Sequence, residues 1–280
     1  MHTETECDIS ALNFIRNPSP YIFRRHYSRG LRSHIFWLLL PEDVAREGKG
    51  EIREGIRIFP KALPNKVLRI FKRDFACLQD ALAEIQRYKI MVSFLAPENM
   101  AQSEEFAVTC MTSSGSKILL CGLQDYVQGN VFDPWGEIHP GRHSDLFQNM
   151  EIPGDRDLAA AFFRKIRDSA AQFVCRIRKM VYETGLIPDL AGVGNIRLST
   201  AGDFCLVDIN NVSAVTFSPE ISTDDKNFPV CDKSVEALSL MEEKLLGQSP
   251  DMSEKLYQTY LSAERKARVM EIIRKEFVSG

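Results

Sequence analysis

The sequence predicts an α+β fold with two lobes, in which an antiparallel N-terminal lobe precedes a mainly helical C-terminal lobe. The chain has 280 residues, which is more than one small hydrophobic core usually covers. Its first half contains short apolar or alternating runs, whereas its second half contains long runs in which apolar residues recur at helical spacing. We therefore expect one lobe at residues 1–121, a hinge at 122–129 and a second lobe at 130–280.

Five short runs predict the strands of the first lobe. They are HIFWLLL (34–40), GIRIF (55–59), KVLRIF (66–71), EEFAVTC (104–110) and SKILLCGLQDYV (116–127). Between the third and fourth run, apolar residues at helical spacing predict one long helix over residues 75–95, with Asp74 as its N-cap. The first lobe is therefore expected to be a five-stranded sheet with one helix.

Helical spacing dominates the second lobe. It predicts helices over residues 157–183, 232–246 and 253–277. One hairpin interrupts these helices, because NIRLS (195–199) and FCLVDI (204–209) are strand-like and the turn formers Gly202 and Asp203 lie between them.

Composition narrows the classes of function. Apolar residues make up 44% of the chain and charged residues 26%, which is typical of a globular protein and argues against extensive disorder. The net charge of -3 provides no overall attraction to nucleic acid or to an anionic membrane. The apolar run at residues 35–40 is too short to span a bilayer, and residues 1–8 are acidic rather than signal-like. We expect a cytoplasmic protein.

The hairpin carries the chemistry. Pairing of its strands returns Asp208 towards Asn195, and Asp189 precedes the hairpin by one short loop, so the three side chains are expected around one polar pocket. Such hard oxygen ligands suit Mg²⁺, which keeps positions open for substrate phosphates and so suggests a nucleotide. The alternative is structural, because Asp at turns and strand ends commonly caps backbone groups.

This order of a carboxylate, a nearby Asn, a hairpin and a second carboxylate after an apolar strand resembles the catalytic loop and metal-binding segment of the protein-kinase-like superfamily. The resemblance implies that Asp189 is the catalytic base and that Asn195 and Asp208 are Mg²⁺ ligands. It also implies ATP as the phosphoryl donor. Asp232, at a helix start, would brace the catalytic loop or simply cap its helix.

The first half of the chain shows the same resemblance. KVLRIFK resembles the strand that supplies the cation for the phosphates, which implies Arg69 or, as second choice, Lys72. Glu84 of the following helix would pair with that cation, and Asp80, whose side chain is shorter, is a weaker alternative. A solvated helix or strand face would explain each of these residues alone.

The strand that ends the first lobe leads into the expected hinge. LLCGLQDYVQG resembles the linker between the lobes, where backbone groups near Gln124, Tyr126 and Val127 would bind adenine. An edge strand followed by a turn is the alternative.

Several departures from the family pattern indicate a compact, atypical relative near the aminoglycoside phosphotransferase-like kinases. Ile187 and Pro188 replace the usual His-Arg before the catalytic Asp, and Asn195 lies six residues after Asp189, one more than usual. Asn210 stands where a permissive glycine is expected. EGKGEIREG (47–55) contains three glycines, but its charges favour a solvated loop over a phosphate-binding loop.

The leading hypothesis is an ATP/Mg-dependent phosphotransferase that acts on a small-molecule, lipid or protein hydroxyl. The alternative is a pseudokinase that keeps the fold as a regulatory binding module. A third class, a nucleic-acid-associated α+β protein, would use the arginines of YIFRRHYSRGLR (21–32). A solvated surface is the favoured interpretation of that segment, so nucleic acid is not the expected partner.

Overall fold

The computed structural model describes residues 15, 19–26, 32–112, 115–136, 154–209, 211–224 and 226–279. The chain divides into two compact units, Met1–Arg87 with Gln102–Tyr126 and Tyr88–Ala101 with Val127–Gly280. The passage from the first unit to the second at Tyr126–Val127 lies inside the segment expected to be the hinge. Residues 88–101, which the sequence analysis assigned to the first lobe, belong to the second unit.

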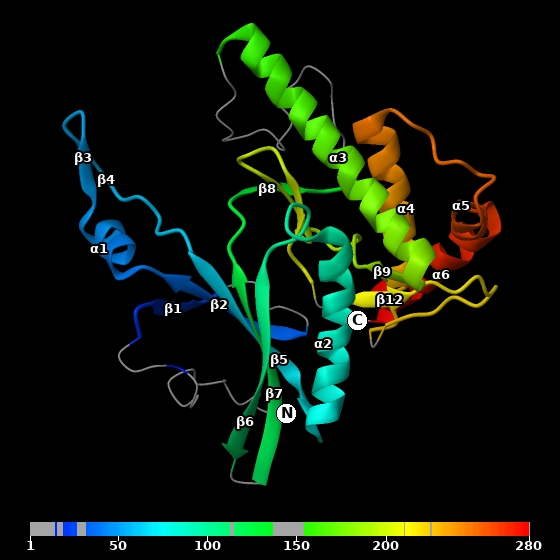
Figure 1. Ribbon diagram of the computed structural model, residues 1–280, viewed down its shortest axis with the longest axis horizontal. Helices are drawn as coiled ribbons and strands as arrows, with labels where there is room; N and C mark the ends of the chain where they lie inside the picture. The colour runs from blue at the N-terminus through cyan, green and yellow to red at the C-terminus, as the bar shows by residue number, and fades with distance from the viewer. Residues whose placement is uncertain are drawn as a thin grey trace. The chain divides into compact units, whose positions relative to one another are not determined.

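The first unit contains a five-stranded sheet in which every neighbouring pair is antiparallel (Figure 1). In the order of the sheet its strands are β1 (Ile22–Arg25), β2 (Ser33–Leu39), β5 (Lys66–Phe75), β7 (Gly115–Asp125) and β6 (Ser103–Thr112). The expected α+β class with antiparallel strands is confirmed.

The membership of this sheet differs from the expectation in one strand. GIRIF is not part of it: β4 (Ile56–Ile58) pairs with β3 (Glu51–Arg53) in a separate hairpin that follows helix α1 (Pro41–Lys49). The side chains of β4 are exposed, so its alternating pattern is not matched by burial. The fifth strand is instead β1, which lies in the basic segment that was interpreted as a solvated surface.

The glycine-rich segment is also more ordered than a loop. Gly48 lies in α1, Gly50 ends that helix at a φ of 69°, and Gly55 lies between β3 and β4 at a φ of 80°. The start of α1 is favoured by a proline in its first turn, because proline has no N–H group that would be left unpaired there. Two acidic residues in the same turn interact favourably with the positive end of the helix dipole.

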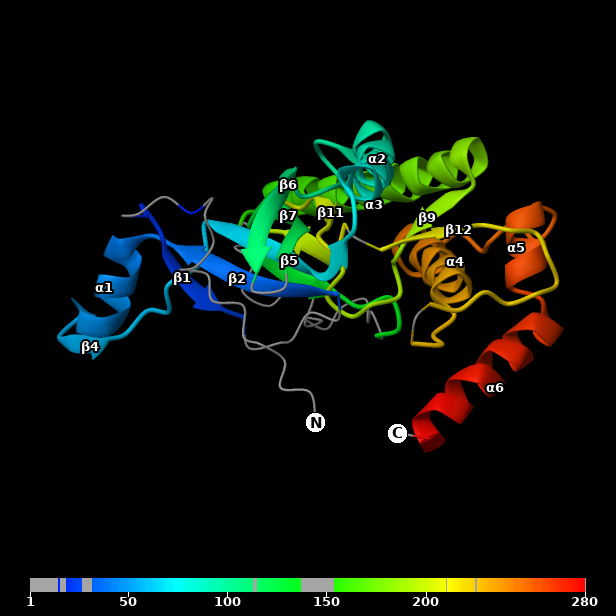
Figure 2. The same ribbon diagram turned by 90° about the horizontal axis from the view of Figure 1, so that it is seen from below.

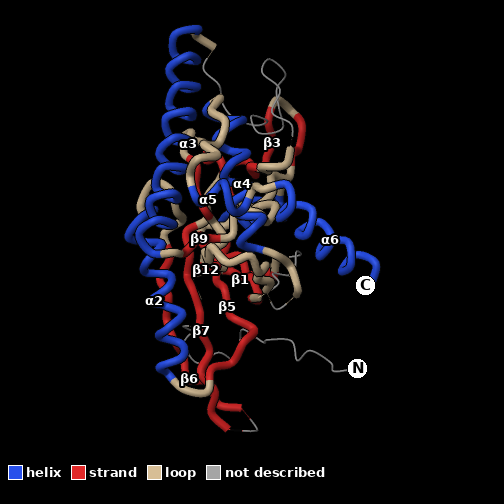
Figure 3. Tube along the Cα trace, turned by 90° about the vertical axis from the view of Figure 1, so that its right-hand side faces the viewer, coloured by secondary structure: helices blue, strands red, loops and turns tan. Residues whose placement is uncertain are grey.

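Both faces of the five-stranded sheet are packed. Phe36, Leu38, Leu68, Ile70 and Cys121 form one cluster, and Phe75 and Leu120 pack with Ala81 and Ile85 of helix α2 in another. Helix α2 spans Leu78–Leu95 (Figure 3). Asp74 does not cap it: this residue lies in β5, and its carboxylate pairs with Lys117 of β7.

In the second unit the longest element is helix α3 (Arg156–Thr184), expected over 157–183. It begins at Asp155, whose Oδ1 accepts hydrogen bonds from the backbone N–H groups of Asp157 and Leu158, and it ends at Gly185 in the left-handed conformation. The short strands beside it are β8 (Gly129–Phe132), β9 (Leu186–Pro188), β10 (Ile196–Ser199), β11 (Phe204–Leu206) and β12 (Val212–Ala214).

These strands form two small sheets, β11-β10-β8 and β12-β9, and β9 and β12 lie beside helix α4 (Figure 2). Helix α4 spans Val230–Met241 and continues in a π-helical turn, Glu242–Leu246. The helix expected over 253–277 is divided into α5 (Lys255–Tyr260) and α6 (Ala263–Ser279). The break is explained by Ser262, whose Oγ accepts a hydrogen bond from the backbone N–H of Arg265 and so starts a new helix.

The core of the second unit is formed by side chains of α3, the small sheets, α4 and α5. Fully buried members include Phe173, Ile177, Leu206, Leu238 and Tyr257. Within the ranges of the chain that are described, no helix is long and apolar enough to cross a membrane.

Candidate functional site

The hairpin of the second unit has the expected pairing. Ile196 lies opposite Leu206 and Leu198 opposite Phe204, and the turn between the strands contains Gly202 at a φ of 89°. Strand β8 adds a third strand to this hairpin, which the sequence analysis did not anticipate. Where the hairpin closes, the backbone N–H of Val207 donates to the carbonyl of Asn195 at 2.8 Å. The residue after Val207, Asp208, is thereby held next to Asn195.

Asp189 directly follows β9 and is held by the loop that leads to the hairpin. Its Oδ1 accepts from the backbone N–H groups of Ala191 (2.9 Å) and Gly192 (3.2 Å), and its Oδ2 accepts from Asn211 Nδ2 at 3.0 Å. The backbone N–H of Asp189 donates to the Asn211 carbonyl at 2.8 Å. The loop and Asn211 together therefore fix the backbone and the carboxylate of Asp189.

Asn195 is joined to the same loop. Its Nδ2 donates to the carbonyl oxygen of Asp189 at 3.0 Å, and the residue is only 9% exposed. Gly192 makes room for it, since a Cβ atom at that position would lie 2.5 Å from Asn195 Nδ2. Because Nδ2 is used inside the loop, Oδ1 is the atom that Asn195 has to offer to a cation.

Opposing effects act on the pKa of Asp189 in this site. Burial raises the pKa of Asp189, and the nearby carboxylate of Asp208 raises it further, while hydrogen bonds from Ala191, Asn211 and Gly192 act in the other direction. Asp189, Asn195 and Asp208 thus lie in one polar region, as the sequence predicted. A cation placed among them would relieve the repulsion between the two carboxylates.

Asn211 is the fourth polar side chain of this region, and it was not among the predicted site residues. The signal for it was the Asn pair that follows Asp208 and Ile209. Asn210, the residue expected in the place of the family glycine, lies outside the described residues.

The site offers few metal ligands, and all of them are hard oxygen donors. They are two carboxylates and the Asn195 amide oxygen, and the described ranges contain no group of three or more His, Cys, Asp or Glu side chains arranged to hold a metal. Such a set fits Mg²⁺, which keeps several waters and binds through one or two carboxylates together with substrate phosphates. It does not fit a dedicated all-protein cage.

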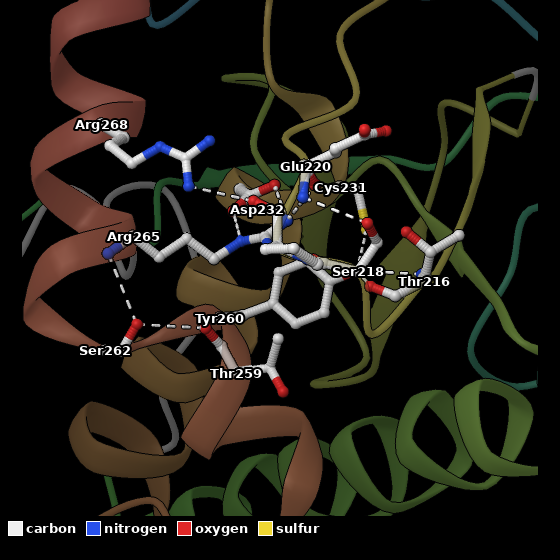
Figure 4. Close-up of polar contacts among 11 residues, drawn as sticks. Thr216, Ser218, Glu220, Cys231, Asp232, Thr259, Tyr260, Ser262, Arg265 and Arg268 are labelled. Carbon is white, nitrogen blue, oxygen red and sulfur yellow. Dashed lines mark hydrogen bonds and ion pairs between the residues drawn. The ribbon is translucent and has the colours of Figure 1, made fainter.

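The expected role of Asp232 is not observed. Helix α4 contacts the loop through Ser234, whose Oγ accepts from the backbone N–H of Leu190 at 3.1 Å. Asp232 does not cap the helix, since Pro229 stands at the N-cap position; its carboxylate instead forms a buried ion pair with Arg265 of α6 (Figure 4).

Arg265 connects this ion pair to the segment that follows β12. Its Nη1 donates to the carbonyl of Ser218 at 2.7 Å and its Nη2 to that of Glu220 at 3.2 Å (Figure 4). The guanidinium carbon lies 4.5 Å from the centroid of the Tyr260 ring, and the Tyr260 hydroxyl donates to the Thr216 carbonyl at 2.7 Å. The segment 216–220 is therefore held by α5 and α6.

In the first unit, the expected ion pair between Arg69 and Glu84 is wrong. Arg69 is buried and pairs with Glu105 of β6. Glu84 instead lies near two exposed arginines, Arg87 at 3.4 Å and Arg73 at 4.0 Å. The sheet explains the difference, because Gly122 of β7 leaves space for the Arg69 side chain to reach across that strand.

The two alternatives to this pair are exposed. Lys72 lies at an exposed position of β5, and Asp80 is exposed in the first turn of α2. Neither side chain is buried, whereas that of Arg69 is.

Backbone groups at two of the positions expected to contact adenine have partners inside their own units. Gln124 is buried on β7, and the backbone N–H of Tyr126 donates to the carbonyl of Asn65 at 3.2 Å. In the second unit, the Val127 carbonyl accepts from Arg197 Nη1 at 3.4 Å. A nucleotide would have to use other groups here or replace these long hydrogen bonds.

Comparison with known proteins assigns no family. No protein-family model matches the chain, and no curated protein matches it significantly.

Proposed function

We propose that the protein is an ATP- and Mg²⁺-dependent phosphotransferase with a kinase-like two-lobed arrangement. The single observation that carries this proposal is the convergence of Asp189, Asn195 and Asp208 at the base of one hairpin. The local chain order of these residues is the order that the protein-kinase-like superfamily uses for its base and its metal ligands.

In this proposal Asn195 and Asp208 bind the cation. Mg²⁺ bound there would neutralise charge on the phosphates of ATP. The loop prepares Asn195 for this role, because the hydrogen bond to the Asp189 carbonyl fixes its amide group. Arg69 contributes positive charge to the phosphates, and the segment around Gln124, Tyr126 and Val127 receives adenine.

Asp189 accepts the proton of the acceptor hydroxyl. Hydrogen bonds from Ala191, Gly192 and Asn211 orient its carboxylate, which lowers the cost of positioning it against a substrate. Its raised pKa makes it a stronger base than an ordinary aspartate, in the direction that proton abstraction requires. The acceptor is a hydroxyl of a small molecule, a lipid or a protein.

One observation favours a second candidate, a pseudokinase that binds nucleotide or a partner without phosphoryl transfer. Both carboxylate oxygens of Asp189 already accept hydrogen bonds, Oδ1 from its own loop and Oδ2 from Asn211, as in a purely structural aspartate. The replacement of His-Arg by Ile187-Pro188 agrees with this second candidate.

A thermal-shift titration with ATP, in buffers with and without Mg²⁺, tests nucleotide binding. A ligand that binds only the native state at a hundredfold excess over its Kd adds about 2.7 kcal/mol of stability, which for a chain of this size raises Tm by roughly 5 °C. We expect this rise with Mg²⁺ present and a smaller one without it.

Two aspartates of the same hairpin supply the comparison. Asp208→Ala should lose the Mg²⁺-dependent part of the rise, whereas Asp203→Ala should keep it, because Asp203 lies at the turn and pairs with Lys165 at 3.3 Å. No rise for the wild type at millimolar ATP would overturn both the phosphotransferase and the nucleotide-binding module.

A further inference from the structure

A buried ion pair crosses one whole strand of the five-stranded sheet. Arg69 of β5, Gly122 of β7 and Glu105 of β6 lie opposite one another in register, so the pair joins two strands that are not neighbours. The side chains of Arg69 and Glu105 are only 6% and 4% exposed. A charged pair with this little exposure is rare unless its partners are well matched.

Gly122 makes the pair possible. A Cβ atom on Gly122 would lie 2.5 Å from Glu105 Oε1 and 2.6 Å from Arg69 Nη2, which is closer than real Cβ contacts come. The two side chains therefore occupy the space that the side chain of any other residue type at position 122 would fill. Glycine weakens a strand interior, and its use here marks a close approach of other groups.

Arg69 has N–H donors that are not used within the described part of the chain. Its Nη2 donates to Glu105 Oε1 and, at 3.1 Å, to Ser103 Oγ. Its Nε and Nη1 are buried and have no hydrogen-bond partner among the residues that are described. A buried donor without a partner costs stability, so each such group needs an explanation, and a catalytic role or a bound ion is one. Guanidinium donors select oxygen anions, above all carboxylate and phosphate.

Glu84 of helix α2 does not form the ion pair with Arg69. This acidic residue at the expected position is directed to exposed arginines at 3.4 and 4.0 Å. The carboxylate that faces Arg69 comes from β6, which belongs to the same sheet as Arg69.

We infer that Glu105, in place of a carboxylate on α2, positions Arg69 to bind a phosphate group through its unused N–H groups. This inference rests on the proposed function and deepens it, because it identifies how the phosphate-contacting cation is held. In protein kinases the corresponding cation pairs with a helix glutamate, and repositioning of the helix regulates the pair. Here both charges belong to one sheet, so the cation is set whenever the sheet is folded and is not switched by α2.

The test measures the Kd of ATP, inorganic tripolyphosphate and adenosine by calorimetry for the wild type and three variants. Glu105→Gln removes the charge that holds Arg69. Arg69→Met/Glu105→Leu replaces the whole buried pair by apolar side chains, which proteins often tolerate without loss of stability. Glu84→Gln is the matched control. We expect the first two to raise the Kd of ATP and tripolyphosphate at least tenfold, while adenosine stays within twofold of the wild type in all variants.

The three ligands separate the inference from the function on which it rests. Tripolyphosphate binding that depends on Glu105, without adenosine binding, would support the phosphate site and overturn the proposed nucleotide function. Unchanged ATP affinity in the double variant would overturn the inference while the function stands. Equal loss of adenosine and ATP in Glu105→Gln, or a tenfold effect of Glu84→Gln, would also overturn it. If the wild type binds none of the three ligands, both proposals fail.

Discussion

Replacement of Arg265 by methionine should lower the free energy of unfolding by about 3–5 kcal/mol, the range expected when one partner of a buried ion pair is removed. The substitution would leave the Asp232 carboxylate in a site where its side chain is only 3% exposed. It would also remove the donors to the carbonyls of Ser218 and Glu220. Urea unfolding followed by circular dichroism measures the loss.

Two further variants define the cause of this loss. Arg265→Met/Asp232→Leu should recover part of the stability, because no unpaired charge stays buried. Lys266→Met, a change at the next residue, removes only a half-exposed contact to Glu236 at 3.8 Å and should cost less than about 1 kcal/mol. If Arg265→Met were no more destabilising than Lys266→Met, the buried pair would not stabilise the fold.

This ion pair is also connected to the candidate site through the chain. The segment that Arg265 holds follows β12, and β12 pairs with β9, the strand that leads directly into Asp189. We therefore expect variants of Arg265 that still fold to bind nucleotide less well than the wild type, although Arg265 makes no contact with the hairpin residues in the described interactions.

The second large effect concerns catalysis. Asp189→Asn should lower the rate of ADP production by about 10²–10⁴-fold, the usual contribution of a general base. The Kd of ATP should stay within twofold of the wild-type value, because asparagine keeps an oxygen for the hydrogen bonds from Ala191 and Gly192. Steady-state assays with water or added hydroxyl compounds as acceptors, together with calorimetry, measure the two quantities separately.

Asp203→Asn is the matched control for this experiment, because it changes an aspartate at the hairpin turn and should leave the rate unaltered. A wild-type rate no higher than that of Asp189→Asn, with ATP binding intact, would identify the protein as a pseudokinase. A simultaneous loss of rate and of ATP affinity in Asp189→Asn would show that the residue supports the loop and does not act as the base.

The sequence was most informative where local signals agree. In helix α3, apolar residues recur at helical spacing over many turns, an Asp stands at the N-cap and a Gly follows the last residue. The expected bounds of this helix differ from the observed ones by one residue at each end. The hairpin of the second unit combined two strand-like runs with a glycine turn, and the two runs pair as expected. Asn195 and Asp208 come together because this pairing is determined by local chain geometry, whereas Asp189 is placed by the pairing of β9 with β12.

The sequence pattern could not predict how strands far apart in the chain pair with one another. The GIRIF run alternates like a sheet strand, but it pairs locally with β3 and leaves the edge of the sheet to β1. The same limit explains the expected Arg69–Glu84 pair. Helical spacing indicated which carboxylates α2 would present, but the register that aligns Arg69, Gly122 and Glu105 depends on contacts between strands far apart in the chain. The two glutamates that begin the strand-like run EEFAVTC were the available signal for Glu105.

The most direct test of the central claim is electron paramagnetic resonance of Mn²⁺, used in place of Mg²⁺, in the presence of ATP. If Asp208 and Asn195 hold the cation of a metal–nucleotide complex, one Mn²⁺ per chain should become protein-bound when ATP is present. Asp208→Ala should abolish that signal, and Asp203→Ala should preserve it. Bound Mn²⁺ that persists in Asp208→Ala, or no ATP-dependent bound Mn²⁺ in the wild type, would contradict the account.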